Sequence, residues 1–323
     1  MSTKNVVDLF DMSAEDSTMD FLNKKSISAD GLYRPTPKDA KDKQKGYVAT
    51  IRFIPNVLED GTLGPSAIEK HVHYANLPDY QELQGYYDSL INFGEKCPLT
   101  TLYWKLKNSK NQAEVERAEL ISRTTKYYSY ILVVEDEQHP EYEGKIMVFP
   151  YGFKIKEKIN LEKTGENSEG KKCNVFDPAN GKDFRLIVKQ IGEFPNYDSS
   201  SFRAVSPLKI WDEEKAKFIQ VPVEWNEEKQ KNVISNAKVQ KKVTDFLFTH
   251  DVKIEDNNPK RWTEEESVKV EKIIEILSGK DISFAKETIS RSSNNVSSKE
   301  KIEDTDSGDT EDLDDFFGNM EDN

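Results

Sequence analysis

Short stretches in which apolar and polar residues alternate with a period of two constrain the fold of this chain more than any other feature. The apolar positions are Tyr47, Ala49, Ile51 and Phe53, then Tyr130, Leu132 and Val134, then Phe184, Leu186 and Val188. Successive side chains of a strand point to opposite faces, so this pattern predicts half-buried strands. The body, residues 46–282, is dense enough in β-branched and aromatic residues to fold, and we expect strands to dominate its middle.

One helix is also clearly marked. Thr263-Glu264-Glu265-Glu266 forms a capping box and is followed by apolar residues at helical spacing, with Gly279 just beyond. This pattern predicts a helix from Glu264 to Ser278. The stretch from Pro78 to Lys110 has no clear period, and Asn111 to Arg117 fits either a helical turn or a loop.

Charge is distributed unevenly along the 323 residues. The net charge is −13, and the segment from Ile302 to Asn323 carries ten Asp and Glu without Lys or Arg, so the rest of the chain carries only −3. Residues 1–45 end in the lysine-dense PTPKDAKDKQKG, and the Ser/Asn-rich SRSSNNVSSK precedes the acidic end. We therefore expect a flexible N-terminal arm (1–45), a folded body (46–282), and a flexible linker with a disordered acidic tail (283–323).

Several classes of protein are disfavoured. The sequence has no apolar run long enough for a membrane span, and its polar start does not resemble a signal peptide. Two cysteines and four histidines give no disulfide framework and little material for a metal enzyme. Phosphate-binding loops, nucleophile elbows and paired metal-spaced histidines are lacking, so we expect a soluble protein that is not an enzyme.

Basic and aromatic residues are interleaved in three places. The first is Ser122 to Tyr130, with Arg123, Lys126, Tyr127 and Tyr128. Non-specific binders of single-stranded nucleic acid use cations for phosphates and rings for bases. Buried core tyrosines are an equally good explanation. Tyr127 and Tyr128 point to opposite faces of a strand, so at least one of these tyrosines should be structural.

The second place is Gly192 to Asp198, where Phe194 and Tyr197 follow the strand predicted around residues 184–191. Loops on a rigid sheet often carry binding residues, although such rings also fold back as a lid on the core. The third place contains Phe149, Tyr151 and Lys154. It is the weakest of the three, because lysines of this kind usually form a solvated face.

Longer motifs then give a resemblance. YYSYILVVEDEQHPEYEGKIMVF with KEKIN, FRLIVKQIGEFPNYDSSSF, GYVATIRFIPN and DTEDLDDFFGN resemble the single-stranded DNA-binding, helix-destabilising replication proteins of T-even-type bacteriophages. The resemblance implies a five-stranded oligonucleotide/oligosaccharide-binding (OB) barrel with an elaborated connecting subdomain. It also implies a DNA cleft, in which the matching positions are Arg123, Tyr127, Tyr128, Phe149, Phe194 and Tyr197. We add Lys126, Tyr151 and Lys154 as neighbouring candidates.

The family's structural zinc is a point of departure. The resemblance implies one His and three Cys as ligands, including a Cys-Pro-x-Cys step. Here His71 and Cys97 match, but Thr100 stands in place of one thiolate. Two ligands do not close a tetrahedral site, so we expect no metal, although His73 or an Asp could substitute as a ligand. Leu99, Leu102, Tyr103 and Trp104 could pack this subdomain instead.

The two ends complete the functional prediction. Lys24, Lys25 and Ser26 resemble the family's short basic-plus-hydroxyl motif, and the resemblance implies contacts between neighbouring protomers for them. In the acidic tail, we expect a docking motif for partner proteins at Leu313, Asp314, Asp315, Phe316 and Phe317. The resemblance implies cooperative coating of single-stranded DNA during phage replication, recombination and repair, in the cytoplasm of the infected host. The tail would gate the cleft and recruit phage replication and recombination proteins. The alternative is an RNA-binding or protein-recruitment adaptor that uses the OB fold as a scaffold.

Overall fold

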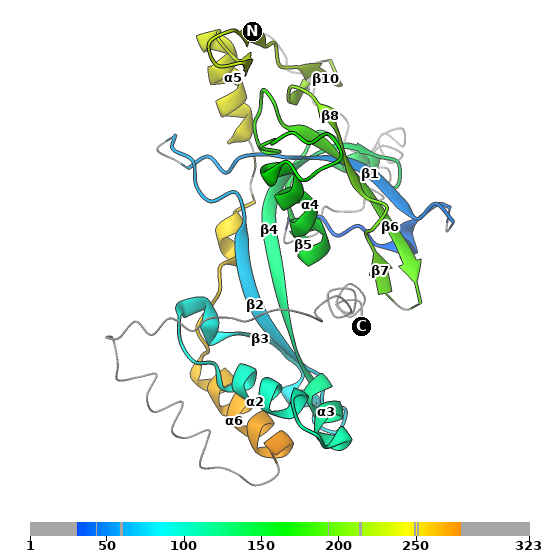
Figure 1. Cartoon of the computed structure of the whole chain (residues 1–323), viewed down its shortest axis with the longest axis vertical. Coiled ribbons are helices and arrows are strands. Elements are labelled where there is room, and N and C mark those ends of the chain that lie inside the picture. The colour runs from blue at the N-terminus through cyan, green and yellow to red at the C-terminus, as the bar shows by residue number, and fades with distance from the viewer. Residues whose placement is uncertain are drawn as a thin grey trace, which may run out of the picture.

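The sixteen-residue strand β4 (Ile121–Asp136) runs through the whole molecule and joins its parts. The computed structural model describes residues 31–278, apart from 43, 59, 60, 193, 213, 214, 249 and 251. The first half of β4 pairs with β2 (Ile68–Ala75), and the second half pairs with β1 (Tyr47–Phe53). β2 and β4 thus form a long ribbon between the body of the sheet and a group of helices (Figure 1).

The sheet is antiparallel throughout. Its strand order is β3 (Gly85–Asp88), β2, β4, β1, β6 (Lys182–Ile191) and β7 (Phe194–Asn196), with β5 (Ile146–Tyr151) paired to β4 and β8 (Ser201–Val205) paired to β6. The register of β1 on β4 shifts between Thr50 and Ile51. Such a bulge bends a strand and increases its twist, which helps the sheet to curl.

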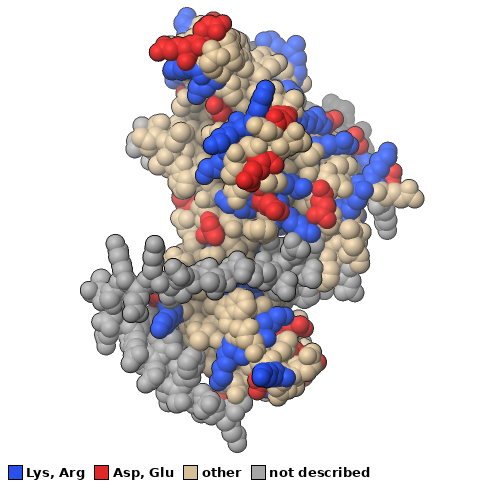
Figure 2. All heavy atoms as spheres, in the orientation of Figure 1, with Lys and Arg blue, Asp and Glu red and all other residues tan. Residues whose placement is uncertain are grey.

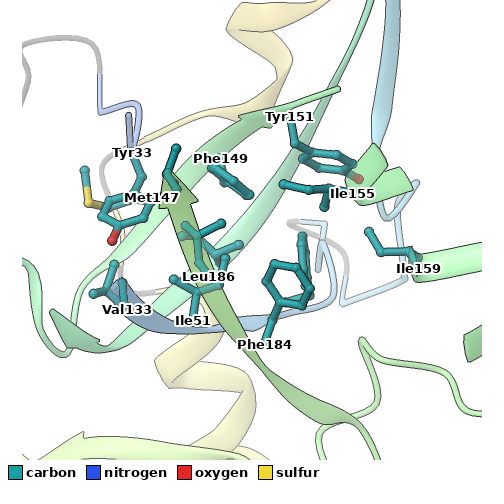
Figure 3. Close-up of a cluster of buried hydrophobic side chains, with 14 of the residues drawn as sticks. Tyr33, Ile51, Val133, Met147, Phe149, Tyr151, Ile155, Ile159, Phe184 and Leu186 are labelled. Carbon is teal, nitrogen blue, oxygen red and sulfur yellow. The ribbon is translucent and has the colours of Figure 1, made fainter. Parts of the chain in front are cut away.

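The curled sheet encloses an aromatic core (Figure 3). Alternate residues of β1, β4, β5 and β6 point into it, and helix α4 (Phe153–Thr164) covers it with Ile155 and Ile159. The rings of Phe53 and Phe149 lie 6.4 Å apart at its centre. The prediction of a mainly β protein with some helix is confirmed, and the curled sheet is consistent with an OB-like fold. The five-stranded barrel stays a prediction, since the pairing gives an eight-stranded sheet.

A helical subdomain packs at the far end of the ribbon. It consists of α2 (Pro98–Lys107), α3 (Gln112–Glu119) and α6 (Glu264–Ser278) around a second apolar core. The predicted capping box of α6 is confirmed: the Thr263 backbone N–H donates to Glu266 at 2.8 Å, and the Glu266 N–H donates to the Thr263 hydroxyl at 3.2 Å. Asn111 caps α3, so the segment left open between helix and loop is helical.

The outer face of the body carries a third apolar cluster, in which Tyr128, Tyr130 and Leu132 of β4 pack against α5 (Ala237–Leu247). Two hairpins precede α5: β9 (Lys209–Asp212) with β10 (Lys217–Gln220), and β11 (Glu224–Asn226) with β12 (Lys231–Val233). Short 3₁₀ helices span Pro37–Asp39, Gln81–Leu83, Leu90–Phe93, Pro140–Tyr142 and Ile254–Asn257. Within the described ranges, the helices lack the length and apolar character needed to cross a membrane.

Part of the segment assigned to the arm packs on the core. Tyr33 is 1% exposed, and its hydroxyl donates to Asp136 at 2.7 Å, beside the hydroxyl of Tyr47, which donates to the same oxygen at 2.6 Å. Burial raises the pKa of both phenols, so they stay protonated and act as donors. Residues 1–30 of the arm and 279–323 of the linker and tail lie outside the described residues.

Candidate nucleic-acid interface

Strand β4 divides the first predicted cluster between its two faces. Tyr127 points to the same side as Ile131 and Val133, into the core that α4 covers. Tyr128 points to the opposite side, into the cluster beside α5. The strand alternation predicted from the sequence is therefore confirmed, and the two neighbouring rings cannot serve one surface.

Tyr127 lies in a small stack of rings beside a lysine. It faces Tyr151 of β5 across the sheet, with the ring centroids 5.7 Å apart and the planes inclined by 22°. The ammonium group of Lys156, on α4, lies 5.2 Å from the centroid of the Tyr127 ring. The Tyr151 hydroxyl bonds to Ser129 at 2.9 Å, and burial raises the pKa of Tyr151, so this ring is held in place and stays neutral.

Asp198 joins α4 to the segment that follows β7. Its carboxylate lies 3.3 Å from the Lys154 ammonium, and its backbone carbonyl accepts from Lys158, also at 3.3 Å. A hydrogen bond from the Asn196 side chain and the contact with Lys154 hold the pKa of Asp198 below its ordinary value. Two stretches forty residues apart in the sequence are thereby brought into contact.

The Phe194–Tyr197 segment is a strand and its edge rather than an open loop. Gly192 has φ of +63°, which suits the tight turn between β6 and β7, and Phe194 then pairs with Ile191 of β6. Phe194 is half-buried, and Tyr197 packs with part of its ring on the aromatic core. We call Tyr127, Tyr151, Phe194 and Tyr197, with Lys154, Lys156, Lys158 and Asp198, the α4–β7 cluster.

Four of the predicted rings are buried: Phe149 is 1% exposed, Tyr151 is 6% exposed, and Tyr127 and Tyr128 are each 8% exposed. Phe149 contacts Phe53, Tyr33 and Tyr151 inside the core, so its ring presents no face to a base. Tyr128 is buried on the face that carries α5. The sequence motif groups these rings with the others because aromatic composition alone does not show which side of a strand lies inside.

Arg123 and Lys126 lie further along β4, towards the helical subdomain, and point to opposite faces. Arg123 is buried opposite His73 of β2. The Lys126 ammonium lies 4.5 Å from the centroid of the Tyr86 ring, and that ring lies 4.9 Å from Tyr74. Arg123 is on the same face of β4 as Tyr127, whereas Lys126 shares its face with Tyr128.

Lys156, Lys158, Tyr74 and Tyr86 are not among the site residues predicted from the sequence. Ile155 and Ile159 stand four residues apart between lysines, a spacing that predicts an amphipathic helix and would have put Lys154 and Lys158 on one element. The pair of Tyr74 and Tyr86 depends on the register of β2 on β3, which no local pattern shows.

The two histidines near the family's zinc positions have different partners. Nδ1 of His71 bonds to the Thr125 hydroxyl at 2.9 Å, whereas His73 is the histidine that reaches Thr100, at 2.8 Å. In the part of the chain that the structure describes, three or more His, Cys, Asp or Glu side chains nowhere gather as a metal ion requires. The arm residues Lys24, Lys25 and Ser26 and the tail residues Leu313, Asp314, Asp315, Phe316 and Phe317 lie outside the described residues.

A curled antiparallel sheet with tyrosine and phenylalanine rings beside lysines is the arrangement of OB-like nucleic-acid-binding domains. Figure 2 shows basic and acidic side chains interspersed over the face that carries α4, so a cationic surface here is local. The model of a family described as "gp32 DNA binding protein like" matches residues 45–247, and the chain belongs to this family. The resemblance read from the sequence motifs is thus confirmed.

Two relatives with sequence similarity to this chain are both named single-stranded DNA-binding protein. The chain is 34% identical over 172 residues to a single-stranded DNA-binding protein of Enterobacteria phage T4, which covers 51% of this chain and 54% of that protein. It is 34% identical over 172 residues to a single-stranded DNA-binding protein of Enterobacteria phage T2, which covers 51% of this chain and 53% of that protein. The chain spans about half the length of these two relatives.

Proposed function

We propose that this protein binds and coats single-stranded DNA without sequence specificity during phage DNA replication, recombination and repair, as a binding protein rather than an enzyme. Family membership and the names of the T4 and T2 relatives support this function. The host cytoplasm is the corresponding place of action.

The α4–β7 cluster is the observation that carries the proposal. Asp198 contacts Lys154 and Lys158 and so holds the adjacent Tyr197 beside the lysines of α4. Phe194 lies half-buried at the start of β7, the strand that leads into this segment. Lysines attract phosphates of any sequence, and every base has a flat face that can stack on a ring. Because a duplex hides those faces, such a surface favours single strands.

Arg123 extends the proposed contact along β4 towards the helical subdomain. It shares a face of the strand with Tyr127, and the residues between them belong to one unbroken register with β2. Tyr127 and Arg123 are each 8% exposed, so DNA that follows this path from Phe194 would reach Arg123 only if the side chains that cover these two residues move on binding. We assign Lys126, with Tyr86 and Tyr74, to the edge of the same path.

The two ends of the chain would act on assembly and partners. Lys24, Lys25 and Ser26 would contact the neighbouring protomer, and the tail, with a charge of −10, would compete with DNA for the basic surface. Displacement of the tail would expose Leu313, Phe316 and Phe317 to replication and recombination proteins.

The test is a titration of the full chain with unstructured single-stranded DNA, the matching duplex, and RNA of the same sequence, at several salt concentrations. We expect the tightest binding to single-stranded DNA and a linear fall of log K with log salt. Tighter binding to RNA would favour the adaptor function instead. Equal binding to single strands and duplex would remove the role of the rings.

A further inference from the structure

The family resemblance implies a structural zinc ion in the helical subdomain, and the polar side chains at that place are arranged differently. His73 comes from β2, Ser89 follows β3, Cys97 precedes α2, and Thr100 lies in the first turn of α2. All four are buried, although their neighbours are the apolar residues of the second core. Buried polar groups of this kind are costly unless they are hydrogen-bonded.

Three of these side chains, His73, Thr100 and Ser89, are joined in a row by hydrogen bonds. The His73 ring lies 3.3 Å from the carbonyl oxygen of Ile121 through Nδ1, and a carbonyl only accepts, so Nδ1 carries the proton. Nε2 then accepts from the Thr100 hydroxyl at 2.8 Å, which leaves the Thr100 oxygen to accept from Ser89 at 3.2 Å. The Nε2 lone pair of His73, which a metal ion would need, already accepts this hydrogen bond from Thr100.

The spacing and chemistry of these groups also do not fit zinc. Two nitrogen or oxygen ligands at about 2.0–2.1 Å from a tetrahedral zinc ion lie about 3.3 Å apart. The distance of 2.8 Å between His73 and Thr100 is a direct hydrogen bond with no room for an ion between them. Structural zinc takes thiolates and imidazoles, whereas Ser89 and Thr100 offer neutral hydroxyls.

Cys97 completes the group. Its side chain is 1% exposed, and it is the residue directly before α2. The hydrogen bonds of His73, Thr100 and Ser89 thus join β2, the end of β3 and the start of α2 at one point.

We propose that His73, Ser89 and Thr100, with the buried Cys97 at the start of α2, form a metal-free clasp that stabilises the subdomain as a structural zinc ion would, with two hydroxyls in place of two thiolates. The clasp fixes α2 to the β2–β3 hairpin through hydrogen bonds alone. The proposal also holds that these side chains converge on one point, so that cysteines at 89 and 100, whose thiolates replace the direct hydrogen bonds, would create a zinc site with His73 and Cys97. This proposal is independent of DNA binding.

The first test uses the unaltered full chain, expressed with added zinc. Metal analysis should find no stoichiometric zinc, and EDTA should leave the Tm unchanged. About one zinc per chain, with a Tm that falls when EDTA is added, would overturn the proposal. Thr100→Val, which keeps the side-chain shape, should lower the Tm by about 2–4 °C because the His73 nitrogen loses its partner; an unchanged Tm would count against the clasp.

The second test restores the thiolates. Ser89→Cys with Thr100→Cys should bind about one zinc per chain, give the absorption of tetrahedral thiolate-bound Co²⁺, and gain a Tm that depends on zinc. The control, Ser89→Cys with Thr101→Cys, has the same number of cysteines. However, the Thr101 hydroxyl points to the Cys97 carbonyl at 2.9 Å, away from the clasp, so this variant should bind no zinc. Equal zinc content in the two variants, or none in the first, would contradict the tetrahedral placement.

Discussion

Phe194 and Tyr128 differ in the role that their positions allow. Phe194 stands half-buried on the short edge strand β7, opposite Ile191. Tyr128 lies within β4 and is covered by the apolar side chains around α5. A base can reach only a ring with an accessible face, so Phe194 is the better candidate for stacking and Tyr128 contributes to stability.

Phe194→Ala should therefore weaken single-stranded DNA binding by about 1–3 kcal/mol and leave the slope of log K against log salt unchanged, because stacking displaces no counterions. Fluorescence titration at several salt concentrations measures both quantities. Ile191→Ala is the matched control: it removes an exposed apolar side chain from the same hairpin and should leave binding unchanged. Tyr128→Ala should instead lower the free energy of unfolding by about 3–5 kcal/mol. The assignment fails if Tyr128→Ala alone weakens binding.

Asp198 provides a second prediction at this scale. Its carboxylate neutralises Lys154, and its depressed pKa keeps it ionised at neutral pH. Asp198→Asn should tighten binding and steepen the slope of log K against log salt by about 0.7 for each further phosphate that the released lysines neutralise. Asp245→Asn makes the same charge change beside Lys241 on α5 and should change neither. Weaker binding by Asp198→Asn would mean that the carboxylate mainly positions Lys154 and Tyr197.

At the scale of elements, α4 is held by a buried lysine on β6. The Lys182 ammonium lies 2.9 Å from Glu162 of α4 and 2.9 Å from Glu169. Burial lowers the pKa of Lys182, but its bonds to Glu169 and Glu162 outweigh burial and raise it overall. The contribution of this pairing to stability is thus fully present below pH 10.5, the ordinary pKa of lysine, and is lost as the pH rises through the higher folded-state pKa.

Lys182→Met should lower the free energy of unfolding by about 3–5 kcal/mol, because it leaves the buried Glu162 carboxylate without its cationic partner and with only the hydrogen bond from Asn167. Urea unfolding measures the loss, and addition of Glu162→Gln to the same chain should recover a large part of it. Lys269→Met removes an exposed partner of Glu265 on α6 and should cost no more than about 1 kcal/mol. If Lys182→Met and Lys269→Met lower the free energy of unfolding by similar amounts, the burial of Lys182 does not increase the contribution of its ion pairs to stability.

The sequence predicts elements with strong local signals and misses those that depend on distant contacts. The helix of Thr263 to Ser278 has its cap and its period within one segment, and it is predicted to the residue. Strand β7 and helix α2 are missed, since β7 depends on pairing with β6 and α2 depends on burial against α6. The candidate site follows the same rule: the motifs supply its rings and lysines, but the assignment of Phe149 to the core comes from the curl of the sheet.

At the scale of the whole molecule, the boundary between arm and body affects how the arm can be tested. Tyr33 is buried and bonded to Asp136, so a truncation at residue 45 would remove part of the core. Deletion of Met1 to Ser28 avoids this residue. It should preserve affinity for DNA one site long but flatten the clustered binding on long strands, as measured by titration on DNA of increasing length. Unbroken coating by the shortened chain would place the contacts between protomers elsewhere.

The last prediction concerns the tail, which carries −10 of the net charge of −13. A charged segment on the same chain competes with DNA at an effective concentration that reaches about the millimolar range. Single strands offer both phosphates and bases and would displace the tail, whereas duplex offers phosphates alone. Removal of Ile302 to Asn323 should therefore tighten duplex binding most at low salt, where screening is weakest, and lower the melting temperature of duplex DNA. Replacement of Leu313, Phe316 and Phe317 by Ala keeps the charge and should abolish only partner recruitment. If the truncated chain binds duplex at low salt no better than the full chain, the tail does not compete for the α4–β7 cluster.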